Sequence, residues 1–288
     1  MKNIALVISS GGARGLAAIG IIEELEKRGH KITSVAGCSI GSLITGMHAS
    51  GNLSVFKEWV LKLNKKEIFR LMDFTISTQG VLKGDKAFEE IKKIIKDVKI
   101  EDLPIPYTAV AVDLVTHKEF VFNSGSLFNA IKGSSSIPSV VTPMKLNDKI
   151  LVDGGIINPL PLSNIKRTDG DILIGIDLNT FNQASYSDST NSLDYSKYIR
   201  MVSDYIPINL NQDSKVGSFL DISSRTFQIM QDEIIKYSIK ENKPDLMISI
   251  PRNTSNMFDF FKAEELIEFG RKTFLEEIEN NKEMNILI

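Results

Sequence analysis

The chain has 288 residues, of which 42% are hydrophobic and 24% charged, and its net charge at neutral pH is −2. This composition is typical of a globular protein with a large core, and it offers no basic surface for nucleic acid. The single cysteine, Cys38, excludes an internal disulfide bond and a cysteine metal cluster.

We expect no targeting segment and no membrane span in this sequence. Its N-terminal apolar run is too short for a secretory signal peptide, and the weakly polar run over residues 32–49 holds too many serines, threonines and glycines for a membrane span. We therefore expect a cytoplasmic protein. Because no linker or internal repeat interrupts the sequence, we expect one domain over residues 1–288.

The first fifty residues predict alternating strands and helices. Residues 4–8 form a short apolar run typical of a buried strand, and a glycine-containing turn follows it. Apolar residues then recur at helical spacing up to Gly29, which favours a helix end there. A second strand over residues 33–36 leads into a turn at Ser39 and a small-residue helix over 40–47. This order predicts an α/β/α fold of three layers around a mostly parallel sheet.

The rest of the chain predicts further elements of both kinds. We expect helices over 53–72, 85–96, 217–240 and 263–280, strands over 107–112, 119–122, 150–152, 172–177 and 246–250, an irregular segment over 74–83, a loop-rich segment over 131–143, and a mobile polar loop over 181–196. The strands at 107–112 and 119–122 are expected to form a hairpin or an adjacent pair.

The pentapeptide around Ser39 reads Gly37-Cys38-Ser39-Ile40-Gly41, a G-x-S-x-G pattern between the predicted strand and helix. A strand that turns sharply into a helix at a serine is the setting of a nucleophile elbow, and the flanking glycines remove side chains that would clash there. The pattern by itself also occurs in ordinary glycine-rich turns. Its interpretation as a nucleophile therefore depends on partner residues elsewhere in the chain.

A second glycine turn, Gly11-Gly12-Ala13-Arg14, follows the first predicted strand. It is not the dinucleotide-binding G-x-G-x-x-G pattern, and no P-loop lysine follows it. We interpret it as an oxyanion hole in which the backbone N–H groups of Gly12 and Ala13 point toward the serine. The alternative is a tight turn with Arg14 in solvent.

A nucleophilic serine needs a proton acceptor, and the usual histidine is hard to find in this chain. The three histidines are His30, His48 and His117, and none follows residue 117. The order of serine, carboxylate and then a histidine near the end of the chain is therefore not found, and a Ser-His-Asp triad is disfavoured, although His117, in a polar turn, stays open as an alternative. The best-placed carboxylate is Asp153, which follows a short predicted strand and precedes two glycines. The same residues are also compatible with a simple Asp-Gly turn.

Four separated blocks together resemble the patatin-like phospholipases, serine acyl hydrolases with a Ser-Asp dyad on an α/β fold. The blocks are Gly11-Gly12-Ala13-Arg14-Gly15, the Ser39 pentapeptide, the serine-rich run over residues 133–138 with Pro143 beyond it, and Asp153-Gly154-Gly155 followed by Asn158-Pro159. Ser10 stands where many members carry a further glycine. After about residue 177 the chain matches no motif of this family.

The resemblance implies that Ser39 is the nucleophile and Asp153 the base. It also implies that backbone groups around Gly11, Gly12 and Ala13 bind the oxyanion and that Arg14 holds their loop. The expected substrate is a lipid or other acyl ester, cleaved without a cofactor or metal ion. Peripheral membrane contact through Phe258, Phe260 and Phe261 is a further hypothesis, and the oligomeric state stays open.

Two other functions are compatible with the same residues. An acyltransferase would use the same elbow to pass the acyl group to an alcohol or thiol. A lipid-binding protein without activity could retain the fold, although the presence of both Ser39 and Asp153 favours an enzyme.

Overall fold

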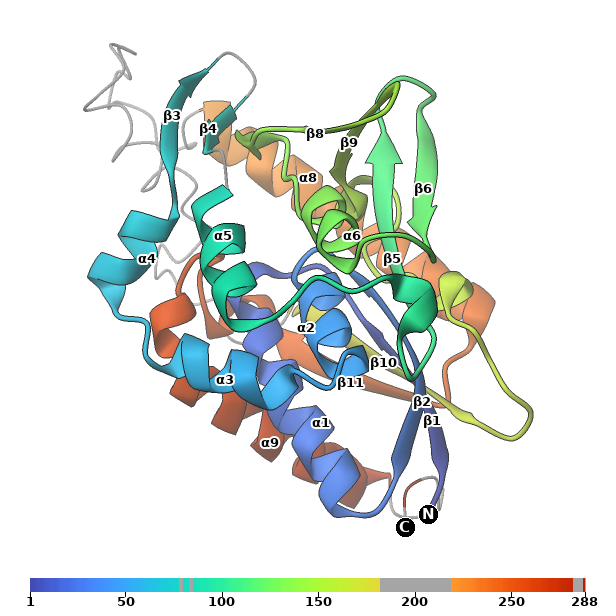
Figure 1. Cartoon of the computed structure of the whole chain (residues 1–288). Helices are drawn as coiled ribbons and strands as arrows, with labels where there is room; N and C mark the ends of the chain where they lie inside the picture. Colours follow the sequence, from blue (N-terminus) through green and yellow to red (C-terminus); the bar gives the residue numbers. More distant parts are fainter. Residues whose placement is uncertain (78–79, 83–84, 182–218, 282–286, 288) are drawn as a thin grey trace.

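A computed structural model describes residues 1–77, 80–82, 85–181, 219–281 and 287 (Figure 1). A central sheet dominates them, with strand order β11-β10-β1-β2-β5-β9-β8 and β6 paired to β5. The parallel strands are β11 (Leu246–Pro251), β10 (Ile172–Thr180), β1 (Asn3–Ile8), β2 (Lys31–Cys38) and β5 (Tyr107–Asp113). The antiparallel strands are β6 (Lys118–Phe122), β8 (Met144–Leu146) and β9 (Lys149–Asp153). The predicted mostly parallel sheet is therefore confirmed.

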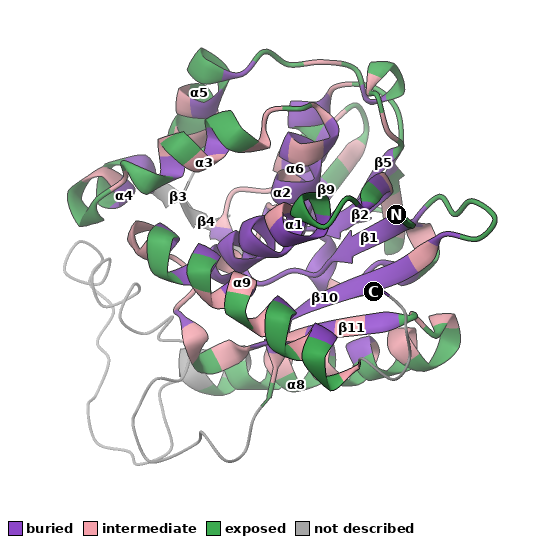
Figure 2. Cartoon of the chain, turned by 90° about the horizontal axis from the view of Figure 1, so that it is seen from below, coloured by how far each residue is buried: buried purple, intermediate pink, exposed green. Residues whose placement is uncertain are grey.

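Helices cover both faces of this sheet (Figure 2). One face packs against α1 (Ala17–Lys27), α2 (Ile40–Ala49) and α9 (Ala263–Asn280), and the other face packs against α8 (Phe219–Asn242). Strand β1 shows why, because its side chains alternate between the two faces. Ile4, Leu6 and Ile8 join the larger core, whereas Ala5 and Val7 join a smaller core with Ile235 of α8.

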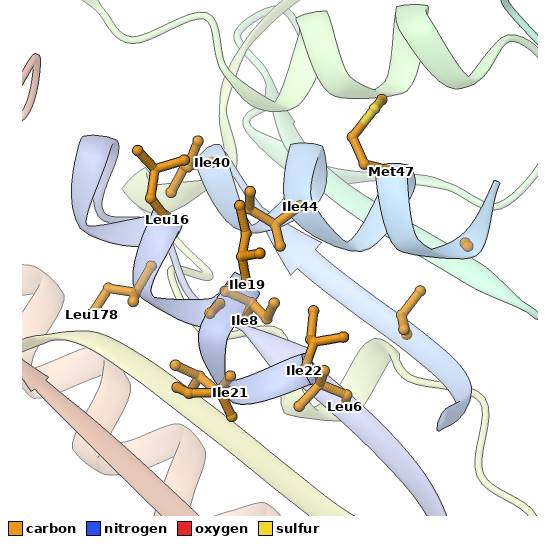
Figure 3. Close-up of a cluster of buried hydrophobic side chains, with 14 of the residues drawn as sticks. Leu6, Ile8, Leu16, Ile19, Ile21, Ile22, Ile40, Ile44, Met47 and Leu178 are labelled. Atoms are coloured by element: carbon orange, nitrogen blue, oxygen red, sulfur yellow. The ribbon is translucent and has the colours of Figure 1, made fainter. Parts of the chain in front are cut away.

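The larger core lies between β1 and two of the helices on its face (Figure 3). Ile19 of α1 and Ile44 of α2 lie close to Ile8 of β1, and all three are fully buried. Leu16 and Ile40 approach each other at the ends of the helices nearest the carboxyl ends of β1 and β2. Packing at this point holds the two turns that carry Gly11–Gly12 and Ser39 side by side.

Smaller elements complete the described chain. They are α3 (Leu53–Leu61), α4 (Lys65–Leu71), β3 (Phe74–Ser77), β4 (Gly80–Leu82), α5 (Asp85–Ile94), α6 (Leu127–Ser134), β7 (Ser139–Val141), and short 3-10 helices over Gly12–Leu16, Ile100–Asp102, Gly154–Ile156, Leu162–Asn164, Arg252–Thr254 and Phe260–Lys262. Strands β3, β4 and β7 form a second, three-stranded sheet.

Three sequence-based expectations about these elements are wrong. The single helix over 53–72 is two helices, because Asn64 starts α4 with a capping box that it shares with Glu67. The segment expected to be irregular over 74–83 contains β3 and β4. The segment expected to be loop-rich over 131–143 begins inside α6. The polar loop expected over 181–196 lies outside the described residues beyond Phe181.

Other expectations are confirmed. Gly29 follows α1 with φ of 78°, a backbone conformation that glycine adopts without strain. Strands β5 and β6 form the expected antiparallel hairpin. The final helix has the predicted limits, Ala263–Asn280. In the part of the chain that the structure describes, no helix has the length and apolar character needed to span a membrane.

Candidate active site

Ser39 occupies a sharp turn between β2 and α2. Its backbone has φ of 56° and ψ of −124°, values that L-residues rarely adopt. Both flanking glycines are required, because a Cβ atom on Gly37 would overlap the backbone of Gly41, and one on Gly41 would overlap the carbonyl of Ile8. The predicted elbow geometry is therefore present, with the Ser39 side chain at the N-terminus of α2.

The pairing of β5 brings Asp153 to the same place. One edge of β5 pairs with β6. The opposite edge of β5 pairs first with β2 and then with β9. Cys38 at the end of β2 pairs with Val110, and Asp153 at the end of β9 pairs with the next residue, Ala111. Since β2 runs parallel and β9 antiparallel to β5, their carboxyl ends meet head to head. Ser39 and Asp153 thus become neighbours although they are far apart in sequence.

Asp153 is only 6% exposed, and its carboxylate has several hydrogen-bonding partners. Its Oδ1 accepts the Gly155 N–H at 2.7 Å and the Cys38 thiol at a sulfur–oxygen distance of 3.6 Å. Burial raises the pKa of Asp153 to about 6, while interactions with the Ser39 hydroxyl, the Gly155 N–H and the Cys38 thiol partly offset that rise. Asp153 is therefore ionised at neutral pH and more basic than a free aspartate.

The serine-rich run at the C-terminal end of α6 makes hydrogen bonds to the backbone of both Ser39 and Asp153. The Ser134 hydroxyl accepts the backbone N–H of Ser39 at 2.9 Å, and the Ser136 carbonyl accepts the N–H of Asp153 at 2.9 Å. Ser134 is completely buried. The sequence singled out this run as a block, but the contacts that it makes depend on the fold.

None of the three histidines lines the pocket around Ser39, within the residues that the structure describes. His48 lies at the end of α2, where burial lowers its pKa to about 4 and its Nδ1 is 3.8 Å from Glu26. His117 lies in the β5–β6 turn with φ of 57°. The geometry therefore presents a serine and a carboxylate without an intervening imidazole.

The glycine loop, residues 9–15, forms the opposite wall of the pocket. Gly12 has φ of 58°, and a Cβ atom on it would lie 2.6 Å from the Met257 carbonyl oxygen. Gly11 and Gly12 both line the pocket with Ser39, and no described residue accepts a hydrogen bond from their backbone N–H groups. Two donors are therefore available to a ligand at this wall.

Ala13 differs from the sequence-based expectation. Its backbone N–H donates to the Met257 carbonyl at 2.8 Å, so this group is already hydrogen-bonded and does not face a ligand. The physical reason is the turn at Gly12, which directs the next peptide toward the segment after β11. The expectation for the Ala13 N–H is therefore wrong, whereas the N–H groups of Gly11 and Gly12 have no acceptor among the described residues.

Arg14 does not extend into solvent, since its side chain is 1% exposed. Its guanidinium donates to the Leu178 carbonyl at 2.7 Å, the Ser255 carbonyl at 3.0 Å and the Asn179 side-chain oxygen at 3.0 Å. These acceptors anchor the glycine loop to β10 and to the segment after β11. The alternative of a solvent-exposed arginine in a simple turn is excluded.

The remaining pocket wall is partly apolar. Its residues are Ile137, Pro138, Phe227 and Met257, together with the polar Ser10, Asn179, Gln228 and Gln231. No sequence motif marks the pocket residues that α8 and the segment after β11 contribute. Nothing in their local pattern distinguishes a pocket residue from one in the core.

Among the described residues, no group of three or more histidine, cysteine, aspartate or glutamate side chains is arranged to hold a metal ion.

Comparison with known proteins agrees with this geometry. The patatin-like phospholipase family model matches residues 6–164, a segment that contains Ser39, Asp153 and the glycine loop. The chain belongs to the patatin-like phospholipase family. This membership confirms the resemblance found in the sequence and supports a lipid hydrolase activity in general terms.

Individual relatives extend the comparison. The chain is 32% identical to an uncharacterized NTE family protein of Mycobacterium bovis, over 93% of this chain and 89% of that protein. It is 29% identical to mouse patatin-like phospholipase domain-containing protein 6, over 67% of this chain but only 15% of that protein. Among solved structures, VipD from Legionella pneumophila aligns with 97% of this chain and 67% of its own chain, at 12% identity and a TM-score of 0.44.

Proposed function

We propose that this patatin-like protein hydrolyses carboxylic esters of lipids, with Ser39 as the nucleophile and Asp153 as the base. The observation that carries the proposal is the head-to-head meeting of β2 and β9, which places a strained serine beside a buried carboxylate. Two unpaired backbone N–H groups, those of Gly11 and Gly12, lie in the same pocket within the described chain. A nucleophile, a base and oxyanion donors are the three parts that acyl transfer needs.

In the first half of the reaction, Asp153 accepts the Ser39 proton as the serine oxygen attacks the ester carbonyl. The negative charge that develops on the carbonyl oxygen is stabilised by the N–H groups of Gly11 and Gly12 and by the N-terminus of α2. The tetrahedral intermediate collapses to an acyl-serine, and the leaving alcohol takes the proton held by Asp153. Water then attacks the acyl-serine while Asp153 accepts its proton. The bond to Ser39 breaks, the Ser39 oxygen takes that proton back from Asp153, and the carboxylic acid is released.

The basicity of Asp153 suits this role. A base works best when its pKa lies near the working pH, and burial raises the pKa of Asp153 to about 6. The hydrogen bonds from Gly155 and Cys38 orient the carboxylate without help from a histidine. Asp153 therefore combines the orienting and proton-accepting functions that other serine hydrolases divide between two residues.

The substrate class follows from the pocket wall and the family. Ile137, Pro138, Phe227 and Met257 offer apolar surface beside Ser39, which suits an acyl chain. The three phenylalanines considered for membrane contact are half-buried: Phe258 and Phe260 pack on described cores, and the Phe261 ring lies 4.8 Å from the Lys65 ammonium. These contacts favour a structural role for the three side chains over a role in membrane contact.

The decisive experiment combines active-site labelling with hydrolysis. We expect a fluorophosphonate probe to label wild type but not Ser39→Ala, and we expect wild type alone to hydrolyse p-nitrophenyl esters with EDTA present. Varying the acyl chain from short to long would define the preferred substrate. Equal hydrolysis by Ser39→Ala would refute the proposed nucleophile. Adding an alcohol acceptor to the same assay separates hydrolysis from acyl transfer, because transfer would yield a new ester.

A further inference from the structure

Asn179 lies near the end of β10, beyond the segment that the family model matches, and is 4% exposed at the wall of the pocket. We propose that Asn179 is a positioning residue that orients the Ser10–Gly11 peptide and thereby aims the Gly11 N–H at the developing oxyanion. The inference rests on the proposed function. It assigns to the unmatched C-terminal part of the chain a specific share in transition-state stabilisation.

The first step is the hydrogen bond that Asn179 makes to the loop. Its Nδ2 donates to the Ser10 carbonyl oxygen at 2.6 Å, and the Ser9 hydroxyl donates to the same oxygen at 2.9 Å. The Ser10 carbonyl and the Gly11 N–H belong to one trans peptide, so they point in opposite directions. Fixing the carbonyl toward Asn179 therefore also fixes the direction of the Gly11 N–H.

The second step is that the Asn179 amide has only one satisfactory orientation. Its Oδ1 accepts from the Arg14 guanidinium at 3.0 Å, and its Nδ2 faces the Ser10 carbonyl. Arginine only donates hydrogen bonds and a carbonyl only accepts them. A flipped amide would place nitrogen against guanidinium and oxygen against carbonyl. The environment therefore requires a side chain that accepts on one side and donates on the other.

The third step concerns the rigidity of Asn179 itself. Its backbone N–H donates to the Asp177 carboxylate at 2.9 Å, and the N–H of the preceding Leu178 donates to the Ser9 hydroxyl at 2.9 Å. Since β10 also pairs with β1, which leads into the glycine loop, the amide is held by the sheet. A donor held in advance costs no reorganisation when charge develops on the substrate.

The test uses substitutions that separate the two contacts. Asn179→Asp keeps an acceptor for Arg14 but places a carboxylate oxygen against the Ser10 carbonyl, whereas Asn179→Ala removes both contacts. Thr180→Val is the matched control, because Thr180 contacts the same Asp177 carboxylate, at 3.3 Å, without touching the glycine loop. Each variant is assayed with a p-nitrophenyl ester and with a trifluoromethyl ketone of equal chain length. The adduct of that ketone with Ser39 places an oxyanion where the transition state would.

We expect kcat to fall by about tenfold in Asn179→Ala and by about a hundredfold in Asn179→Asp, with little change in KM, because only the transition state uses the Gly11 N–H. The Ki of the ketone should rise by the same factor as kcat/KM falls. Thr180→Val should match wild type in both. Circular dichroism and thermal unfolding show whether each variant is folded. If Asn179→Asp does not fold, the kinetics of Asn179→Ala alone test the inference.

The outcomes distinguish this inference from the proposed function. If wild type acts through Ser39 but folded Asn179 variants keep their kcat, the inference is wrong and the proposed function stands. Loss of kcat without a matching change in the ketone Ki would also overturn it, because the effect would then not lie in oxyanion binding. If Ser39→Ala hydrolyses as well as wild type, both fail together.

Discussion

The two halves of the pocket are held in place by different means. Ser39 and Asp153 are positioned by backbone pairing, since β2 and β9 meet along one edge of β5. The glycine loop is positioned by contacts with distant parts of the chain, at Asn179, Ser255 and Met257. The positions of Ser39 and Asp153 are set by strand register, whereas the position of the glycine loop depends on individual hydrogen bonds. Substitutions of the side chains that make those bonds should therefore affect the glycine loop more selectively.

The largest expected effect comes from Asp153→Asn, which leaves the sheet intact and removes only the base. We expect kcat to fall by about ten-thousandfold, because an amide of nearly the same shape cannot accept the proton. The stability of the folded protein should instead increase in Asp153→Asn. Wild-type Asp153 has its pKa raised from 3.8 to about 6 by burial, so the native state loses stability as pH rises through that range.

At neutral pH that loss amounts to about 2–3 kcal/mol, which the neutral amide avoids. Thermal unfolding should therefore show a higher Tm for Asp153→Asn than for wild type at pH 7.5, with the difference shrinking toward pH 4. Asp148→Asn, in the exposed β8–β9 turn, provides a control that should leave both activity and Tm unchanged. A lower Tm for Asp153→Asn at pH 7.5 would show that burying the Asp153 carboxylate does not lower the stability of the wild-type protein.

The second-largest effect is expected in the glycine loop, from Gly12→Ala. Gly12 has a positive φ and its added Cβ would meet the Met257 carbonyl, so the loop must move. We expect kcat/KM to fall by about a hundred- to a thousandfold, as for loss of an oxyanion donor. Gly51→Ala is the matched control: Gly51 has φ of 71° with open space around it, so backbone strain is similar and crowding is absent. Equal losses of activity in both variants would contradict this account.

The same division explains how much of the site could be predicted from sequence. Ser39 and Asp153 were predicted because short glycine-rich patterns mark the strand ends that carry them. Asn179 and Met257 could not be predicted in this way, since each contacts the loop from an element with an ordinary local pattern. The error at Ala13 has the same origin, because its acceptor, the Met257 carbonyl, is contributed by a distant segment.

The fold shows a similar contrast. Buried strands such as β1 and β10 were predicted from short apolar runs, which are typical of strands buried on both faces. The break between α3 and α4 was missed because apolar spacing continues across it, while the helix start is made by the Asn64–Glu67 capping box. Strands β3 and β4 were missed because Gly80 and Gly84 in this stretch of sequence favour an irregular backbone.

A smaller effect is expected from Gln231 of α8, the side chain that contacts both halves of the site. Its Nε2 donates to the Gly155 carbonyl at 2.9 Å and lies 3.5 Å from the Ser10 hydroxyl. We expect Gln231→Leu to reduce kcat/KM by about tenfold or less, through loss of one good hydrogen bond and one weak one. Glu233→Gln, two residues along and exposed, should have no effect. A loss as large as that of Gly12→Ala would show that the two halves are held as one unit.

The smallest effect is expected at Cys38, and it should be visible only in the pH profile. Burial raises the pKa of the Cys38 thiol, so the thiol stays protonated and donates to Asp153. That bond lowers the pKa of Asp153. In Cys38→Ala, the pH at which kcat/KM falls on the acidic side of its profile (the acidic limb, at about pH 6) should therefore rise by several tenths of a unit. Cys38→Ser retains a donor and should show a smaller shift.

The comparison between these two Cys38 variants carries the argument, because both remove the sulfur but only one removes the hydrogen bond. If the acidic limb lies at the same pH in both variants, the hydrogen bond from the thiol does not affect the pKa of Asp153. Variants at the glycine loop and at its contact Asn179 offer the complementary test, because neither adds a charge: Gly12→Ala and Asn179→Ala should lower kcat/KM while leaving the pH of the acidic limb unchanged. A limb that moved with them would show that the loop also sets the basicity of Asp153, and the division into two independently held halves would fail.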